Sequence, residues 1–165
     1  MIYIFRHQEG DPEMSNCLSS VGMKHSNDIA NRLMGTDQFK RIYYACMPRA
    51  DGKHVRPIQT ASIICTKLSV PLTLVYSHKE IAMLDSHSTN YDNVIVWHHK
   101  DIPNLLRCYV KGAQFAWPNT NYSGCLVVDA INARWCFFDD YRSVNFRNGN
   151  RKSVIRRVVN AFRCF

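Results

Sequence analysis

Residues 1–10 read MIYIFRHQEG, an apolar and aromatic run that changes abruptly to Arg6 and His7. A short apolar run that ends in polar residues and a glycine is typical of an interior β-strand. We therefore predict a strand over residues 1–5 that carries a cation and an imidazole at its carboxyl end. A second apolar run, NVIVW at 93–97, ends in the same way, in His98 and His99. In parallel sheets the carboxyl ends of the strands border one crevice, so two parallel strands would bring these tips together.

Helices and strands alternate along the rest of the chain. From Arg56 to Leu68, apolar residues recur at helical spacing, which predicts a helix. The other expected elements are a helix over 18–34 capped by Ser19 or Ser20, strands over 41–47 and 70–76, a helix over 102–110, two strands within 124–141 and an amphipathic segment over 151–162. Residues 8–17, 47–55 and 79–92 are expected as loops. This order predicts a single α/β domain over residues 1–165, a three-layer sandwich with a mostly parallel central sheet.

Composition sets the class of protein. The 165 residues are 46% hydrophobic and 21% charged, values that indicate a folded globular chain. No apolar run approaches the roughly 20 residues needed to cross a bilayer, and the first residues lack the pattern of a signal peptide. The seven cysteines are scattered without a CxxC pair, which argues against a structural zinc site and favours reduced thiols. We therefore expect a cytoplasmic protein without a transmembrane segment.

The net charge of +8 belongs mainly to the C-terminal segment 142–165. This segment holds seven of the 21 basic residues and no acidic one, whereas the first 141 residues carry 14 basic and 13 acidic side chains. Such a segment could bind nucleic acid or anionic lipid. The reading we favour is a closing helix whose apolar side packs on the sheet while its arginines are solvated.

Four short motifs, in order, resemble those of the histidine phosphatase (phosphoglycerate mutase-like) superfamily. They are IYIFRHQEG at 2–10, CLSSVGMKH at 17–25, RPIQTASII at 56–64 and VIVWHHKDIPNLL at 94–106. One branch of the superfamily carries Trp-Glu-His-x-x-Ile-Pro in the fourth motif, and the later WP…NYSGCLVV also resembles that branch. The match runs from residue 2 to about 130 and implies a phosphoglycerate mutase-like fold.

The resemblance implies a phosphatase that works through a phosphohistidine intermediate. His7 would be the nucleophile. A covalent intermediate replaces one difficult displacement by two easier ones. Arg6 and Arg56 would bind the phosphoryl oxygens, because a guanidinium grips them in a bidentate manner. His99 would also face the phosphoryl group, and Glu80 would serve as general acid and then as general base. The resemblance implies no metal and no organic cofactor.

Several assignments within this scheme have competitors. Spacing in the commonest family pattern favours His98 as the second histidine, whereas the Trp-x-His-x-x-Ile-Pro branch favours His99, which we choose. Asp85 competes with Glu80 as the proton donor. Glu9 would help to order the loop after His7, or would be an exposed turn residue. Gln8 departs from the small residue that the family usually has beside the nucleophile, and could crowd the phosphate pocket.

The sequence therefore predicts a metal-independent phosphomonoester hydrolase. Its partner would be a phosphorylated substrate, either a small molecule or a phosphoprotein. The main alternative is a weak or inactive family member that binds a phosphorylated ligand or, through its basic C-terminal segment, an anionic partner. A mutase is less favoured, because the chain leaves little room for the segments that mutases need to retain the intermediate.

Overall fold

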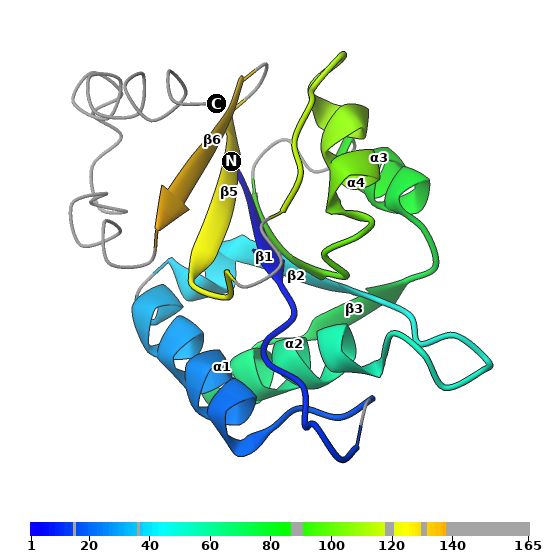
Figure 1. The fold of residues 1–165 in the computed structure, drawn as a ribbon. Coiled ribbons are helices and arrows are strands. Elements are labelled where there is room, and N and C mark those ends of the chain that lie inside the picture. The colour runs from blue at the N-terminus through cyan, green and yellow to red at the C-terminus, as the bar shows by residue number, and fades with distance from the viewer. Residues whose placement is uncertain (15, 36, 87–90, 118–120, 130–131, 138–165) are drawn as a thin grey trace.

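The computed structural model describes residues 1–14, 16–35, 37–86, 91–117, 121–129 and 132–137 (Figure 1). The backbone alone is described for 85, 86, 129 and 132–137. The basic C-terminal segment and the amphipathic segment expected over 151–162 lie outside the described residues. Within the described part, no helix has the length and apolar character required to traverse a bilayer.

A six-stranded sheet forms the centre of the fold, in the order β3-β2-β4-β1-β5-β6. Its strands are β1 (Ile2–Arg6), β2 (Arg41–Cys46), β3 (Leu72–Val75), β4 (Asp92–Trp97), β5 (Gly124–Asp129) and β6 (Asn132–Phe137). The first four run parallel to one another, whereas β5 pairs antiparallel with β1 and with β6. The mostly parallel sheet expected from the alternating sequence is therefore confirmed.

Two pairs of helices cover the two faces of this sheet (Figure 1). One face carries α1 (Ser20–Leu33) and α2 (Val55–Leu68), and the other carries α3 (His78–Ser86) and α4 (Ile102–Tyr109). A short 3-10 helix, Gln38–Lys40, leads into β2. The three-layer sandwich is confirmed in this arrangement.

Alternation along the strands divides the apolar core between the two faces. In β1, Tyr3 and Phe5 pack with apolar residues of α1 and α2, while Ile4 packs with those of α3 and α4. All three side chains are buried. Because β1 is covered on both faces, it must be apolar at every position before its tip, as its sequence is.

The helix α3 lies where a loop over 79–92 was expected. Its start carries a local capping arrangement: the Ser77 hydroxyl accepts a hydrogen bond from the Glu80 amide at 3.2 Å, and the Glu80 carboxylate accepts one from the Tyr76 amide at 2.7 Å. Ser-x-x-Glu is a helix-start signature in sequence. Ile81 then packs in the core. This contact anchors the helix although the amphipathic periodicity of its sequence is weak.

Candidate active site

The tips of β1 and β4 adjoin each other. Arg6 is in register with Trp97, and the His7 amide donates to the Trp97 carbonyl at 3.1 Å. The residues that follow these two strands are thereby held together. His7 Nε2 lies 3.2 Å from His99 Nδ1, and the rings of His7 and His98 are 5.3 Å apart between centroids. Both histidines of the second tip therefore lie beside His7, with His99 in hydrogen-bonding contact.

A hydrogen bond to the backbone fixes which ring nitrogen of His7 carries the proton. His7 Nδ1 lies 3.0 Å from the carbonyl oxygen of Gln8, and a carbonyl oxygen can only accept. In neutral His7 the proton must then be on Nδ1, which leaves the Nε2 lone pair directed toward His99. His99 Nδ1–H can donate to that lone pair. The arrangement presents one defined nucleophilic nitrogen at the end of a buried strand.

Burial keeps His7 neutral. The side chain has no exposed surface, and burial, followed by the positive charges of Arg56 and Arg6, lowers its pKa to about 3. Burial likewise lowers the pKa of His98 to about 4, with help from His54 and His99, and that of His99 to about 4, with help from Arg6. At neutral pH His7 is therefore a neutral imidazole, the form of histidine that can act as a nucleophile.

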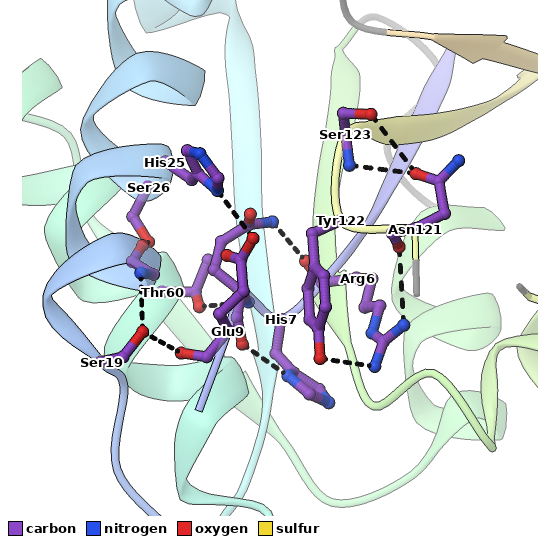
Figure 2. A network of polar contacts seen from close by, with 12 residues as sticks. Arg6, His7, Glu9, Ser19, His25, Ser26, Thr60, Asn121, Tyr122 and Ser123 are labelled. Atoms are coloured by element: carbon purple, nitrogen blue, oxygen red, sulfur yellow. Dashed lines mark hydrogen bonds and ion pairs between the residues drawn. The ribbon is translucent and has the colours of Figure 1, made fainter. Parts of the chain in front are cut away.

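Two guanidiniums border the imidazoles. Arg6 is buried and donates to the Tyr122 hydroxyl at 3.1 Å, with its guanidinium 4.0 Å from the centre of the Tyr122 ring (Figure 2). Burial lowers the pKa of Arg6, and the charge of Arg56 acts in the same direction. Arg56, at the start of α2, is close enough for its charge to act on His7, His98 and His99 as well. His7 and Arg56 thus belong to one cluster although the chain separates them widely.

Gly10 makes room for Arg56. A Cβ atom at Gly10 would lie 2.5 Å from Arg56 Nη1 and 3.2 Å from its Cζ, far inside normal contact. Gly10 forms an isolated antiparallel bridge with Leu18, so the loop here is extended. The glycine of the first motif is therefore required by the position of the guanidinium.

Side chains of α1 and α2 hold the loop that follows His7. Thr60 accepts a hydrogen bond from the Gln8 amide at 3.0 Å, and Gln59 accepts one from the Leu18 amide at 2.9 Å. The Ser19 amide donates to the Glu9 carbonyl at 3.0 Å. These contacts give the Gln-Thr pair of the third motif a physical role, since the pair positions the loop beside His7.

The loop also packs closely on α1. A Cβ at Gly22 would lie only 2.3 Å from the Glu9 carbonyl oxygen, so the second motif needs glycine for backbone contact. Glu9 Oε1 pairs with His25 Nδ1 at 2.8 Å, as Figure 2 shows. Glu9 is thus partly buried and bound to α1, which fits the loop-ordering role expected for it.

The Gln8 side chain points away from Nε2 of His7. Its amide nitrogen donates to the Arg6 carbonyl at 3.0 Å, and the residue lines a hollow with Ile29 and Tyr122 on the α1 side of the strand. The side chain is almost fully buried. Crowding of the phosphate pocket, which its size suggested, does not follow from this placement.

The two proposed proton donors lie on α3. Glu80 is half-buried in the first turn, where its carboxylate accepts a hydrogen bond from the Tyr76 amide. Asp85 is in the last turn, five residues or about 7.5 Å further along the axis. His78, also in the first turn, reaches Asp101 at 3.5 Å, just after His98 and His99. The first turn of α3 therefore lies near the second strand tip. Among the described contacts of Glu80 there is none with His7.

Three imidazoles of this cluster could act as metal ligands. One nitrogen from each of His7, His98 and His99 lies within 4.8 Å of the others. The cations Arg6 and Arg56 act on the same imidazoles. Their charges disfavour a bound dication and favour an anion, because like charges repel strongly where burial limits solvent screening. Chemically, the arrangement suits a tetrahedral oxyanion facing a nucleophilic nitrogen.

Comparison with solved structures identifies the fold. A mycobacterial glucosyl-3-phosphoglycerate phosphatase superposes with a TM-score of 0.54 at 12% identity, over 83% of this chain and 97% of the other. The protein histidine phosphatase SixA, complexed with tungstate, gives a TM-score of 0.54 at 17% identity, over 82% and 94%. The chain has the histidine phosphatase fold. A third similar structure, mycobacterial hydrolase 1, gives a TM-score of 0.52 at 13% identity, over 82% and 95%.

Sequence comparison gives no relative of this histidine phosphatase-like chain. No protein-family model matches it, and no curated protein matches it. The phosphoglycerate mutase-like fold expected from the four motifs is nevertheless confirmed by the structural neighbours.

Proposed function

We propose that this protein hydrolyses phosphomonoesters through a phosphohistidine intermediate on His7. The observation that carries the proposal is the hydrogen bond from His7 Nδ1 to the Gln8 carbonyl, which leaves the lone pair on Nε2, where it faces His99 near two guanidiniums. Two of the structural neighbours are phosphatases, and one of them is complexed with tungstate, a tetrahedral oxyanion. Both facts are consistent with a phosphate-binding site here.

In the first step, the His7 Nε2 lone pair forms a bond to phosphorus and the ester P–O bond breaks. Arg6 and Arg56 would stabilise the negative charge on the oxygens of the transferring group, and His99 would donate a hydrogen bond. Glu80 would give its proton to the leaving oxygen. Asp85 remains the competing donor, but its place at the far end of α3 favours Glu80.

In the second step, water attacks the phosphorus while the carboxylate of Glu80 accepts the water proton. The P–N bond breaks, its electron pair returns to Nε2, and inorganic phosphate leaves. The Nδ1 hydrogen bond to the Gln8 carbonyl keeps the imidazole in one orientation through both steps, which is what covalent catalysis from a fixed strand tip requires. In this mechanism the chain's own side chains supply every proton and charge.

The test is hydrolysis of an aryl phosphate, with and without a chelator. Wild-type protein should release phosphate equally in both conditions, and His7→Ala should abolish release. Quenching during turnover with alkaline detergent, in which the P–N bond survives, should trap up to one phosphoryl group per chain on His7. His78→Gln, which removes an imidazole paired with Asp101, is the matched control and should stay active.

Two results would contradict the proposal: full activity in His7→Ala, or loss of wild-type activity on chelation. Phosphate binding without any turnover would instead support the alternative of an inactive member that binds a phosphorylated ligand. Binding of an anionic partner through residues 142–165 is a separate proposal that concerns the segment outside the described residues. Retention on nucleic acid or anionic vesicles, compared before and after truncation of that segment, would test it.

A further inference from the structure

A pocket lies beside the proposed phosphate site. It has a volume of about 300 Å³ and is lined by Asn16, Lys53, His54, Arg56, His98 and Lys100, among others. Arg56 and His98 also belong to the cluster around His7. An anion bound by this cluster would therefore adjoin the pocket through these two side chains.

The walls of this pocket are positively charged. Lys53, Arg56 and Lys100 line it, and none of the described residues that line it is acidic. Two carboxylates lie nearby. Asp51 pairs with Lys53 at 3.2 Å and with Arg49 at 3.5 Å. The other, Asp101, is held by hydrogen bonds from the Trp97 indole and the Asn104 amide. Asp51 is shared between two cations, so its single charge does not cancel both, and Lys53, Arg56 and Lys100 together set a positive potential along the pocket.

One wall is built with a strained backbone. His54 has φ 63° and ψ 28°, a left-handed conformation that is rare for a non-glycine residue, and it directly precedes α2. Its ring stacks on His98 with centroids 4.3 Å apart and planes 20° apart. A left-handed non-glycine residue is strained, and such residues tend to occur at functional sites. Here that conformation stacks the His54 ring on His98, beside the His7 cluster.

We propose that the substrate is a small phosphomonoester with a second anionic group, which binds between Lys53 and Lys100. The inference rests on the proposed function, because the phosphoryl group is taken to occupy the His7 cluster. A volume of 300 Å³ fits a small molecule, at the lower end of the range for ligand pockets. A carboxylate or a second phosphate would satisfy the same charges, and the matched ligands below use a carboxylate.

The test compares two phosphonates, which cannot be hydrolysed at the P–C bond. Ethylphosphonate carries the phosphoryl-like group alone, and 3-phosphonopropionate adds a carboxylate. Calorimetric titration of wild-type protein should show 3-phosphonopropionate binding about tenfold more tightly, equivalent to about 1.4 kcal/mol. In Lys53→Gln/Lys100→Gln the ratio of the two affinities should fall to about one.

A matched control removes the same number of positive charges outside the pocket. Lys67→Gln/Lys111→Gln also removes two exposed lysines, at the ends of α2 and α4, and should keep the tenfold ratio. Equal wild-type affinities for the two phosphonates would overturn the inference, as would a ratio that survives in Lys53→Gln/Lys100→Gln. If aryl phosphate hydrolysis persists in that case, the proposed function stands without the second subsite. If neither phosphonate binds, the phosphate site and the subsite that depends on it are both refuted.

Discussion

Replacing Gly10 by alanine should displace Arg56 without unfolding the protein. The new Cβ would start 2.5 Å from Arg56 Nη1, and ordinary contact begins at 3.4 Å, so the guanidinium must move by about 0.9 Å. Such a displacement of a positioning group can cost about a hundredfold in rate. We therefore expect kcat/KM for an aryl phosphate to fall by about two orders of magnitude in Gly10→Ala.

Stability should change little in the same variant. Gly10 lies in an extended bridge and has no left-handed backbone, so alanine can adopt its conformation. The atoms in the way belong to the far end of a flexible side chain, whose rotamer shift costs about 0.5–1.5 kcal/mol. Reduced freedom of the unfolded chain offsets about 0.4–1 kcal/mol of that cost. Thermal unfolding should show a midpoint within a few degrees of the wild type.

A double-mutant cycle isolates the route through Arg56. If Gly10→Ala acts by moving this guanidinium, it should add nothing to the loss already caused by Arg56→Ala. Steady-state kinetics of the two single variants and the double variant would measure this. The reasoning is refuted if Gly10→Ala retains wild-type activity, or if it costs another hundredfold in the Arg56→Ala background.

Three further changes probe the loop, the guanidinium and the imidazoles. Gly22→Ala should lower the free energy of unfolding by about 1–3 kcal/mol, because its Cβ would meet the Glu9 carbonyl at 2.3 Å; unchanged urea unfolding would contradict this. Tyr122→Phe removes the hydroxyl that accepts from Arg6, and should raise KM for an aryl phosphate up to about tenfold; an unaltered KM would show that the hydroxyl does not position the guanidinium. Because the pKa of His7 is lowered to about 3, the unfolded chain binds more protons between about pH 3 and 6.5, so stability should fall as pH drops through this window. His7 alone should contribute about 1.4 kcal/mol per pH unit there, and urea unfolding at pH 5 and 7 should show a smaller difference in His7→Gln than in the wild type.

Local sequence indicated a mostly parallel sheet and two strands with polar tips. The apolar runs before Arg6 and before His98 have the character of strands buried on both faces, and the structure adds that the two strands are parallel neighbours. The proximity of His7 and His99 is a direct result of that register. The helix α3 was missed because its apolar contacts are few, although Ser77 and Glu80 carried a helix-start signal.

Contacts between segments that are far apart in the chain could not be predicted from the sequence. Nothing local indicates that Tyr122 binds Arg6 from the segment before β5, or that His54 stacks on His98. The direction of the Gln8 side chain also depends on the Arg6 carbonyl and on α1 packing. These features are decided by tertiary geometry, in which a difference of about one ångström separates a bound phosphoryl group from a blocked pocket.

The position of β1 between β4 and β5 has a consequence during synthesis. Ile4 pairs with Ile95 on one side and Leu126 on the other, so both partners are translated some ninety or more residues later. The strand β1 cannot pair until they emerge, and this high contact order slows folding. A nascent chain that stalls before β5 would expose an unpaired edge of Tyr3, Ile4 and Phe5, a ready template for aggregation. The time at which β5 emerges from the ribosome should therefore determine how strongly the nascent chain depends on chaperones.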